Sequence, residues 1–333
     1  MTNQGELQAS IRQLTSTTND YNGDLHALFD LAGIASGEFN GRMILWLQQA
    51  TGSSITDIDG LKQLYAEQQG LYNWNSLAGR LITPMGGLLS SCVFDLDCTT
   101  KASYAGGSFL NMETTPTDSE VQSEYDYEAT GTSIPTFTGS QGDADSYFLF
   151  DGNDRFNGVN SLSTFLDSIH KTTGGNDFTF VMTYYHVNAS AVLMTNRQAG
   201  STNIGVMMYT LASSNDLHLL QRGSTANSPD FQSTTAMNTS AWNFIAAGHQ
   251  HSSNTSRLWV NSTTAQETTQ AFNATTATAS ATEFSIGAYG GGTLPIANGA
   301  RIKSVIVFNK LLSNTEITTV AKQLELRHNA TYV

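Results

Sequence analysis

Residues 178–187, FTFVMTYYHV, make up an apolar and aromatic run of strand length. Successive side chains of a strand point to opposite faces, and here both faces are apolar or aromatic. One face carries Phe178, Phe180, Met182 and Tyr184, and the other carries Val181, Tyr185 and Val187. A strand with two such faces must be covered on both sides. The run therefore predicts a central strand of a sheet that lies between two other layers.

Shorter segments of period two surround this strand from Leu88 to the C-terminus. Clusters of Gly, Asn, Asp and Ser separate them, as between short strands. The segments read SCVFDLDC, SYFLFDG, NIGVMMYTL, DLHLLQR, AWNFIAAGHQ, SRLWVN, TEFSIGAYG and ARIKSVIVFN. Many short strands with closely spaced turns predict a mainly β protein, built as an antiparallel β-sandwich of the jelly-roll type.

Helical patterns occur at both ends of the chain. Near the C-terminus, Ser313 and Glu316 have the spacing of a capping box. Apolar residues then follow at helical spacing, so we expect a C-terminal helix against the sandwich or across its rim. These residues are Ile317, Val320, Ala321 and Leu324. A second short helix is predicted at 161–171.

The N-terminal part has a different period from the rest. Residues 24–79 show short helical patterns that stop at Gly52 and Gly70, as glycine commonly follows the end of a helix. A turn-rich junction, RLITPMGG, then precedes the strands. We therefore divide the chain into an N-terminal α-helical docking module, 1–87, and a β domain, 88–333.

Composition excludes several classes of function. Charged residues make up only 13% of the 333 residues, and the net charge is −13. Nucleic acids and anionic membrane surfaces require basic footprints, so neither is an expected partner. The first residues, MTNQGELQAS, predict no signal peptide, because they have neither a basic nor an apolar region. No apolar run approaches the ~18 residues of a membrane span. Cys92 and Cys98, roughly 20 Å apart on an extended segment, are expected to be free thiols from a reducing compartment.

The β region carries a family resemblance over 88–333. The segments CVFDLDCTTKASYAGGSFLNM, YFLFDGNDRFNG, WNFIAAGHQHSSNTSRLWVN and GARIKSVIVFNKLLSNTEITTVAKQL occur in the order and spacing of laminin-G-like jelly-roll domains of bacteriophage structural proteins. In that comparison YFLFDGNDRFNG is a hairpin, and Ser262 replaces a usual glycine. The resemblance implies a concanavalin-A-like lectin fold that serves binding or assembly more often than catalysis.

On this basis the sequence predicts a non-enzymatic virion protein of a bacteriophage, as a capsid decoration, fibre or tail-associated protein. The resemblance implies other virion proteins of the head or tail as partners, a homo-oligomer with a trimer preferred, and exposure on the particle surface after synthesis in the host cytoplasm. The jelly roll would project outward and bind a host-surface glycan. A free carbohydrate-binding lectin module is an alternative.

Residues 123–130, SEYDYEAT, offer a second alternative. On a strand Glu124, Asp126 and Glu128 share one face, and retaining glycosidases need two carboxyls about 5–5.5 Å apart. The spacing also resembles the catalytic strand of laminarinase-type β-glucanases, so a glycan-depolymerising hydrolase could use Glu124 and Glu128. The surrounding sequence is polar and rich in turns. We favour an exposed acidic strand with Tyr125 and Tyr127 packed inward, its carboxylates away from the floor of any aromatic cleft.

One candidate site could bind a calcium ion. Asp151, Asn153 and Asp154 have the hard oxygen atoms that Ca²⁺ prefers, with Asp95 and Asp97 as added carboxylates. A plain Asp-Gly turn is the favoured alternative, so the sequence predicts no cofactor other than this candidate Ca²⁺.

The glycine-rich loop AYGGGTLP, with Tyr289, Gly291 and Gly292, is the candidate glycan contact. Trp242, Trp259, Tyr184 and Tyr185 could add to a sugar platform, although we expect the two tryptophans in the core. His249 and His251 are expected in a solvated loop, because no third zinc ligand accompanies them.

Overall fold

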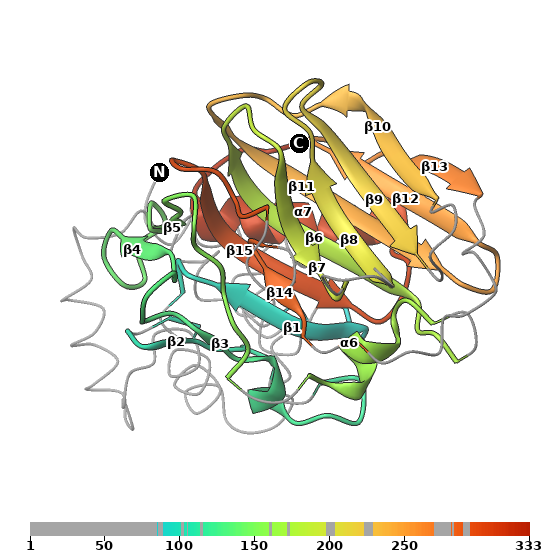
Figure 1. Cartoon of the computed structure of the whole chain (residues 1–333), viewed down its shortest axis with the longest axis horizontal. Helices are drawn as coiled ribbons and strands as arrows, with labels where there is room; N and C mark the ends of the chain where they lie inside the picture. Colours follow the sequence, from blue (N-terminus) through green and yellow to red (C-terminus); the bar gives the residue numbers. More distant parts are fainter. Residues whose placement is uncertain are drawn as a thin grey trace, which may run out of the picture.

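The β domain is a sandwich of two antiparallel sheets with a C-terminal helix, as predicted (Figure 1). The computed structural model describes Met85 and residues 89–333, without 101–102, 105, 114–115, 160–161, 172–173, 198–203, 223–228, 270–280, 282 and 289–293. Apart from Met85, the predicted docking module 1–87 and the junction lie outside the described residues. Among the described helices, none is both long and apolar enough to cross a membrane.

The larger sheet has eight strands and forms the middle layer. Its order is β13 (Gln266–Thr269), β12 (Thr255–Val260), β11 (Ala241–Gln250), β6 (Phe178–His186), β15 (Arg301–Phe308), β5 (Tyr147–Leu149) and β4 (Thr136–Thr138), and β1 (Cys92–Asp97) also pairs with β15. Strands from the two ends of the domain thus lie side by side, so the fold closes on itself.

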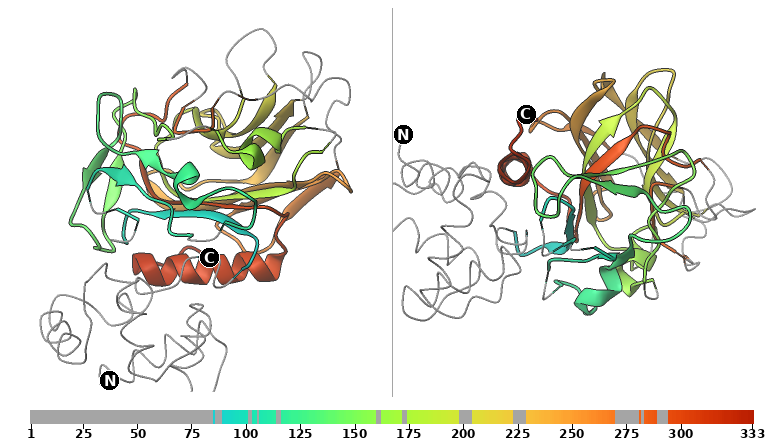
Figure 2. Two further views of the ribbon diagram at one scale, coloured as in Figure 1. Left: turned by 90° about the horizontal axis from the view of Figure 1, so that it is seen from below. Right: turned by 90° about the vertical axis from the view of Figure 1, so that its left-hand side faces the viewer.

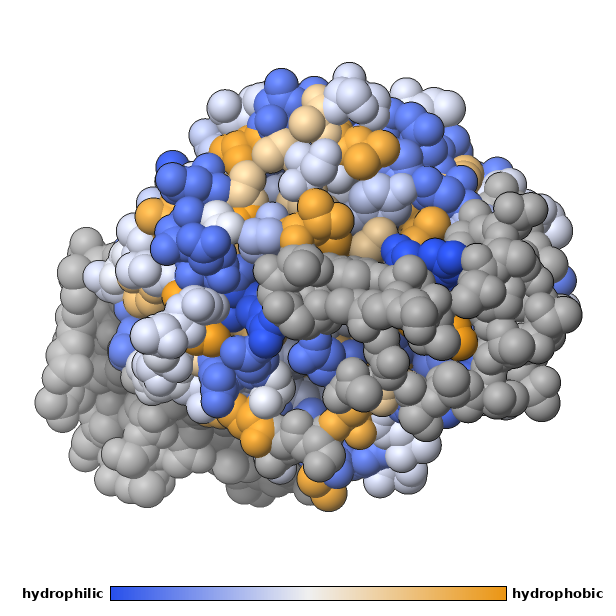
Figure 3. All heavy atoms as spheres, in the orientation of Figure 1, coloured by the Kyte–Doolittle hydropathy of each residue, from blue (hydrophilic) through white to orange (hydrophobic). Residues whose placement is uncertain are grey.

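The smaller sheet has five strands and packs over the first. Its order is β10 (Asp230–Ala236), β9 (Asp216–Arg222), β8 (Gly205–Thr210), β7 (Ala191–Thr195) and β14 (Ser285–Ile286). A two-stranded ribbon, β2 (Ser108–Phe109) with β3 (Tyr127–Glu128), lies beside the sandwich. Figure 3 views the side toward which the smaller sheet faces, where apolar residues are scattered among polar ones.

Strand β6 occupies the central position that its sequence predicts. It pairs with β11 on one side and β15 on the other. Phe178, Phe180, Met182 and Tyr184 point into the core between the sheets. Val181, on the opposite face, belongs to a second apolar cluster that helix α7 (Asn314–His328) covers. The prediction of a doubly covered strand is confirmed.

Helix α7 forms the third layer, against the outer face of the larger sheet (Figure 2). The capping box is present: the Ser313 backbone N–H donates to Glu316 Oε2 at 2.9 Å, and the Glu316 N–H donates to Ser313 Oγ at 3.3 Å. The four predicted apolar positions, Ile317, Val320, Ala321 and Leu324, are all completely buried. The second predicted helix is present as the single turn α6 (Thr164–Ser168).

The predicted hairpin at YFLFDGNDRFNG is wrong. Strand β5 pairs with β4 and β15, not with the segment that follows the turn. Beyond the turn, Phe156 instead forms a bridge with Ile286 of the smaller sheet. Gly152, at φ 100°, lets the backbone turn away. The ring of Phe156 fills the core against Phe148 at a centroid distance of 4.9 Å, so burial of this ring favours the crossover between sheets.

Both cysteines are free thiols, as predicted, and both are buried. Cys92 begins β1 and Cys98 follows its end, so the extended strand separates them. Burial raises the pKa of both thiols, which makes them poor nucleophiles. The compartment in which the protein resides stays a prediction.

Candidate functional site

A cavity of about 210 Å³ opens where the ribbon, α6 and the edge strand β14 meet. Its wall combines carboxyl, amide and hydroxyl groups with aromatic and aliphatic side chains. The lining residues are Glu124, Tyr127, Asn157, Gly158, Leu162, Ser163, Leu166, Glu283, Phe284 and Ser285. Both kinds of surface are what a binding site for a small polar molecule needs.

The apolar part of the wall belongs to the core and is therefore rigid. Phe284 is buried and packs edge-on against Phe180 at 5.7 Å and Phe94 at 6.3 Å between ring centroids. Tyr127 lies on β3 and contacts Phe94 at 6.1 Å. Asn157 accepts the N–H of Glu128 through its backbone oxygen at 2.7 Å, which holds the segment after the turn beside β3.

The polar part of the wall includes one member of a carboxyl pair, Glu124. Its neighbour Glu120 accepts the backbone N–H of Thr164, at the start of α6, at 2.9 Å. A hydrogen bond between the two carboxyls raises the pKa of Glu124 and lowers that of Glu120. Glu120 is held against the start of α6, and Glu124 places a carboxyl at the cavity that can take part in hydrogen bonds with a ligand.

The prediction of one acidic strand at 124–128 is wrong. Glu124 lies in a 3₁₀ helix, η2 (Gln122–Tyr125), and caps it by accepting the N–H of Val121 at 2.9 Å. Asp126 accepts the backbone N–H of Asn111 at 2.7 Å. Only Glu128 is exposed on a strand, as expected. The local contact between Glu124 and Val121 competes with an extended conformation.

The tyrosines between these acids are buried, as predicted. They face the core, with the Tyr125 ring 5.5 Å from that of Phe94. The expectation that the acids avoid an aromatic cleft is wrong for Glu124, which lines the cavity together with Tyr127 and Phe284. Glu128 does not line it, so the structure does not bring the two predicted glutamates together at this site.

The candidate calcium ligands form a tight turn whose carboxylates bind its own backbone. Asp154 Oδ2 accepts the N–H of Asp151 at 2.8 Å, and Asp151 Oδ1 accepts the N–H of Asn153 at 2.9 Å. Within the described part of the chain, no group of three or more His, Cys, Asp or Glu side chains is arranged to hold a metal. The contacts favour the plain-turn alternative, and binding of Ca²⁺ stays a prediction.

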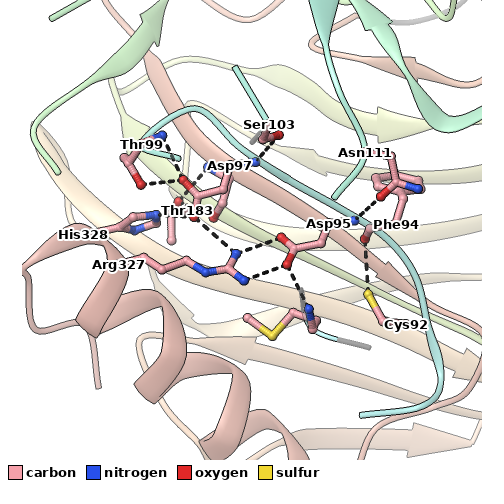
Figure 4. A network of polar contacts seen from close by, with 12 residues as sticks. Cys92, Phe94, Asp95, Asp97, Thr99, Ser103, Asn111, Thr183, Arg327 and His328 are labelled. Atoms are coloured by element: carbon pink, nitrogen blue, oxygen red, sulfur yellow. Dashed lines mark hydrogen bonds and ion pairs between the residues drawn. The ribbon is translucent and has the colours of Figure 1, made fainter. Parts of the chain in front are cut away.

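The other two carboxylates considered for calcium, Asp95 and Asp97, are used elsewhere (Figure 4). Arg327 of α7 donates to both oxygens of Asp95 at 2.8 and 2.9 Å and to Asp97 at 3.4 Å. His328 contacts the same oxygen of Asp97 at 3.1 Å. All four side chains are fully buried.

Burial by itself would raise the pKa of Asp97, but the charges of His328 and Arg327 outweigh burial and lower it. Asp95 also accepts the backbone N–H of Met85 at 3.0 Å. The network therefore attaches both α7 and the backbone at Met85 to β1. Its buried carboxylates have structural partners, which leaves them unsuited to ligand binding.

The remaining sequence candidates fall in different places. Tyr289, Gly291 and Gly292 lie outside the described residues. Trp259 is buried as expected, whereas Trp242 is only half-buried.

The prediction of a solvated loop for the two histidines is wrong. His249 lies within β11, completely buried, with Nδ1 2.9 Å from Ser256 Oγ. His251 is in the following turn and half-buried, with Nε2 3.1 Å from the carbonyl oxygen of Ile169. The alternation of side chains along β11 places His249 on the inner face with Ile245 and Ala247. The polar residues that follow it in the sequence had indicated a loop instead.

Sequence reasoning missed Glu120, Asn157, Ser163, Glu283 and Ser285. Asn157 lies in the segment YFLFDGNDRFNG and Ser163 in the predicted helix, but neither pattern marks them as site residues, and chain segments far apart bring the five together. The one available signal was the predicted helix at 161–171, whose N-terminal turn supplies part of the cavity wall.

Comparison with known proteins gives likenesses in structure. No protein-family model matches the sequence, and neither does any curated protein. The sialidase of Trypanosoma rangeli, solved with sialic acid, aligns at a TM-score of 0.48 and 12% identity. That alignment covers 75% of this chain and 36% of the sialidase, so the chain spans about a third of that protein's length.

Two binding domains give comparable likenesses. The binding domain of botulinum neurotoxin DC, in complex with SialylT, aligns at a TM-score of 0.49 and 11% identity, over 70% of this chain and 52% of that one. The CBM40 domain of Ruminococcus gnavus IT-sialidase, bound to α2,3-sialyllactose, aligns at 0.40 and 15%, over 52% of this chain and 95% of the domain. The β-sandwich class is confirmed by the structure itself, and membership of the laminin-G-like family stays a prediction.

Proposed function

We propose that this chain is a non-enzymatic glycan-binding protein and that the cavity at Glu124 holds one sugar residue. The observation that carries the proposal is the composition of the cavity wall. Carboxyl, amide and hydroxyl groups from Glu124, Glu283, Asn157 and Ser285 stand beside the aromatic surface of Phe284. A sugar ring presents the same combination, with hydroxyl groups around its edge and C–H groups on its faces.

The size of the cavity supports a small ligand. Pockets for drug-sized molecules usually measure about 300–1,000 Å³, and this cavity has about 210 Å³. It admits a terminal sugar, while the rest of a glycan would extend into solvent. Because the apolar wall is continuous with the core, the site is formed before the ligand binds, which reduces the entropic cost of binding.

Titration calorimetry of the full chain with neutral hexoses, N-acetylhexosamines and short glycans tests this proposal. We expect one or more sugars to bind, and Glu124→Gln or Glu283→Gln to weaken the binding of that sugar about tenfold, through loss of one hydrogen bond to a carboxyl group. Glu128→Gln is the matched control, because Glu128 is exposed on the same segment but outside the cavity. Absence of binding across the panel, or equal affinity in all three variants, would overturn the proposal.

One observation favours glycan hydrolysis as a second candidate. The hydrogen bond with Glu120 raises the pKa of Glu124, which is the direction that the general acid of a glycosidase requires. Its partner at the cavity would be Glu283 rather than the predicted Glu128. Release of reducing ends from a broad polysaccharide panel, lost in Glu124→Gln with folding intact, would support this activity. No turnover on any substrate would exclude it for those substrates.

We further propose that the protein belongs to a bacteriophage particle, on the head or tail, with the sandwich projecting outward. The acidic surface, poor in lysine, and the ordered motifs of 88–333 support this assignment. Residues 1–87 would dock onto other virion proteins, and symmetry of the particle favours a homotrimer. Neither nucleic acid nor an inserted membrane is among the proposed partners.

Mass spectrometry of purified phage particles tests the virion assignment, because a structural protein must be present at fixed stoichiometry. Native mass measurement of the purified chain tests the trimer. A stable monomer with sugar affinity, absent from particles, would favour the free lectin module instead.

A further inference from the structure

A cluster of two cations and three aromatic rings lies on the outer face of the larger sheet, and its Trp242 packs against the apolar cluster that α7 covers. Tyr147 comes from β5, Tyr185 from β6, Trp242 from β11, and Arg301 and Lys303 from β15. Tyr185 shares its face with Val181, which α7 covers at the other end of the strand. We call these five residues the cation–aromatic cluster.

Strand register brings the cluster together. Arg301 lies directly opposite Tyr185 on β6, and Trp242 lies opposite Tyr185 on its other side. The Arg301 guanidinium carbon is 4.4 Å from the ring centre of Tyr185 and 4.6 Å from that of Tyr147. The guanidinium is therefore held between two rings, each within the range of a cation–π contact. Such stacking covers the two faces of a guanidinium and leaves the N–H groups of its two terminal nitrogens at the edge for a ligand.

The hydrogen-bond donors of this clamp are unused. Among the described residues, Arg301 forms no ion pair and no side-chain hydrogen bond, and its buried Nε has no partner. The Tyr147 and Tyr185 hydroxyls likewise make no hydrogen bond within the described residues. Other described arginines differ: Arg257 pairs with Glu267 at 2.7 Å, and Arg327 binds two aspartates.

The second cation extends the same feature. Lys303 Nζ lies 4.9 Å from the ring centre of Trp242 and donates to the carbonyl oxygen of Ala144 at 2.7 Å. It forms no ion pair with any described carboxylate. Asp97, Asp143 and Asp145 lie close enough to Lys303 to act on it electrostatically, so Arg301 is the cation of the cluster that no described carboxylate pairs with. A buried or stacked donor without a partner is costly unless a ligand satisfies it.

We propose that the cation–aromatic cluster is a binding site for the carboxylate of an acidic sugar, a hexuronate or a related sugar acid. The edge of the Arg301 guanidinium would bind the carboxylate in bidentate fashion. The Tyr147 and Tyr185 hydroxyls, flanking the guanidinium, would bind ring hydroxyl groups. A free carboxylate would use only the arginine, and an acidic peptide has no row of hydroxyls to match the tyrosines. This site is separate from the cavity at Glu124 and does not depend on sugar binding there.

The test compares methyl glucuronide with methyl glucoside, which differ in the carboxylate alone. Titration calorimetry and saturation-transfer NMR on the full chain should show the glucuronide binding at least tenfold more tightly, with affinity that falls as salt rises. Arg301→Gln should lose that tenfold preference, and Tyr185→Phe, which keeps the stacked ring, should weaken the glucuronide a few-fold. Arg257→Gln is the matched control, with the same loss of charge on the same sheet, and should bind like the wild type.

Several outcomes overturn the proposal. These are equal affinity for the two glycosides, full binding by Arg301→Gln, or no binding of the glucuronide. An acidic peptide that binds through Arg301 while the glucuronide does not would assign the site to protein instead. If Arg301→Gln fails to fold, the glycoside comparison and the salt dependence on the wild type still decide. Glu124→Gln, measured with the same probe, should bind unchanged, which separates this site from the cavity.

Discussion

At the scale of single residues, buried histidines determine how the protein responds to acid. Burial, with a smaller contribution from His251, lowers the pKa of His249 from 6.5 to about 3. Burial also lowers the pKa values of His186, His251 and His328. Each of these groups binds its proton more readily in the unfolded chain. Their contribution to stability is present above pH 6.5 and is lost as the pH falls toward the folded pKa.

We predict that His249→Gln makes the protein less sensitive to acid. Between pH 6.5 and 5, His249 alone lowers the free energy of unfolding by about 2 kcal/mol, at 1.36 kcal/mol per pH unit. Urea unfolding at pH 7 and pH 5 should therefore show that the free energy of unfolding decreases by about 2 kcal/mol less in the variant than in the wild type. Glutamine can keep the contact to Ser256. The same pH dependence in both proteins would show that His249 is not the responsible group.

Gly205 is a position where the backbone allows no other residue. Its φ is 138°, and an added Cβ would lie 2.4 Å from Arg197 Cα, a backbone atom that cannot move aside. Gly205→Ala should destabilise the protein by about 1–3 kcal/mol or more. Gly107, at φ 109° with open space around it, is the control for the conformational cost alone. Thermal unfolding should show a larger loss for Gly205→Ala than for Gly107→Ala, and equal losses would refute the steric argument.

At the scale of elements, α7 depends on both its cap and its buried charges. Removing Arg327 leaves Asp95 and Asp97 buried without their main partner. We predict that Arg327→Ala costs about 3–5 kcal/mol of unfolding free energy. Ser313→Ala, which removes only the exposed cap, should cost about 1 kcal/mol. Urea unfolding of both variants measures the difference, and a smaller cost for Arg327→Ala than for Ser313→Ala would contradict a structural role for the network.

At the scale of the whole molecule, the middle layer depends on α7 to cover its outer face. The larger sheet is apolar on both faces, and α7 covers residues such as Val181, Ile306 and Phe308 on its outer face. Deleting residues 313–333 would expose that face, and exposed apolar sheet surfaces associate. We predict aggregation of the truncated chain in size-exclusion chromatography. Lys322→Ala, on the half-buried side of α7, should elute like the wild type.

The fold was largely predictable from the sequence, because period and capping are local signals. The two apolar faces of residues 178–187 indicated a central strand, and Ser313 and Glu316 indicated where α7 begins. Local patterns failed where a contact distant in sequence competes with them. Burial of Phe156 against the other sheet replaced the predicted hairpin. The acidic strand failed for a local reason, because Glu124 caps a 3₁₀ helix in place of its first part.

The sequence by itself determined the β-sandwich, its central strand, the C-terminal helix and the free cysteines, since each follows from alternation, helical spacing or residue distance along the chain. Only the tertiary structure decided the sites. The cavity joins Glu124 to Glu283 and Ser285, which lie more than half the β domain away along the chain. The clamp around Arg301 needs three strands in one register. Side chains from distant segments meet only when the sheets pair and pack, and no local pattern in the sequence encodes that pairing.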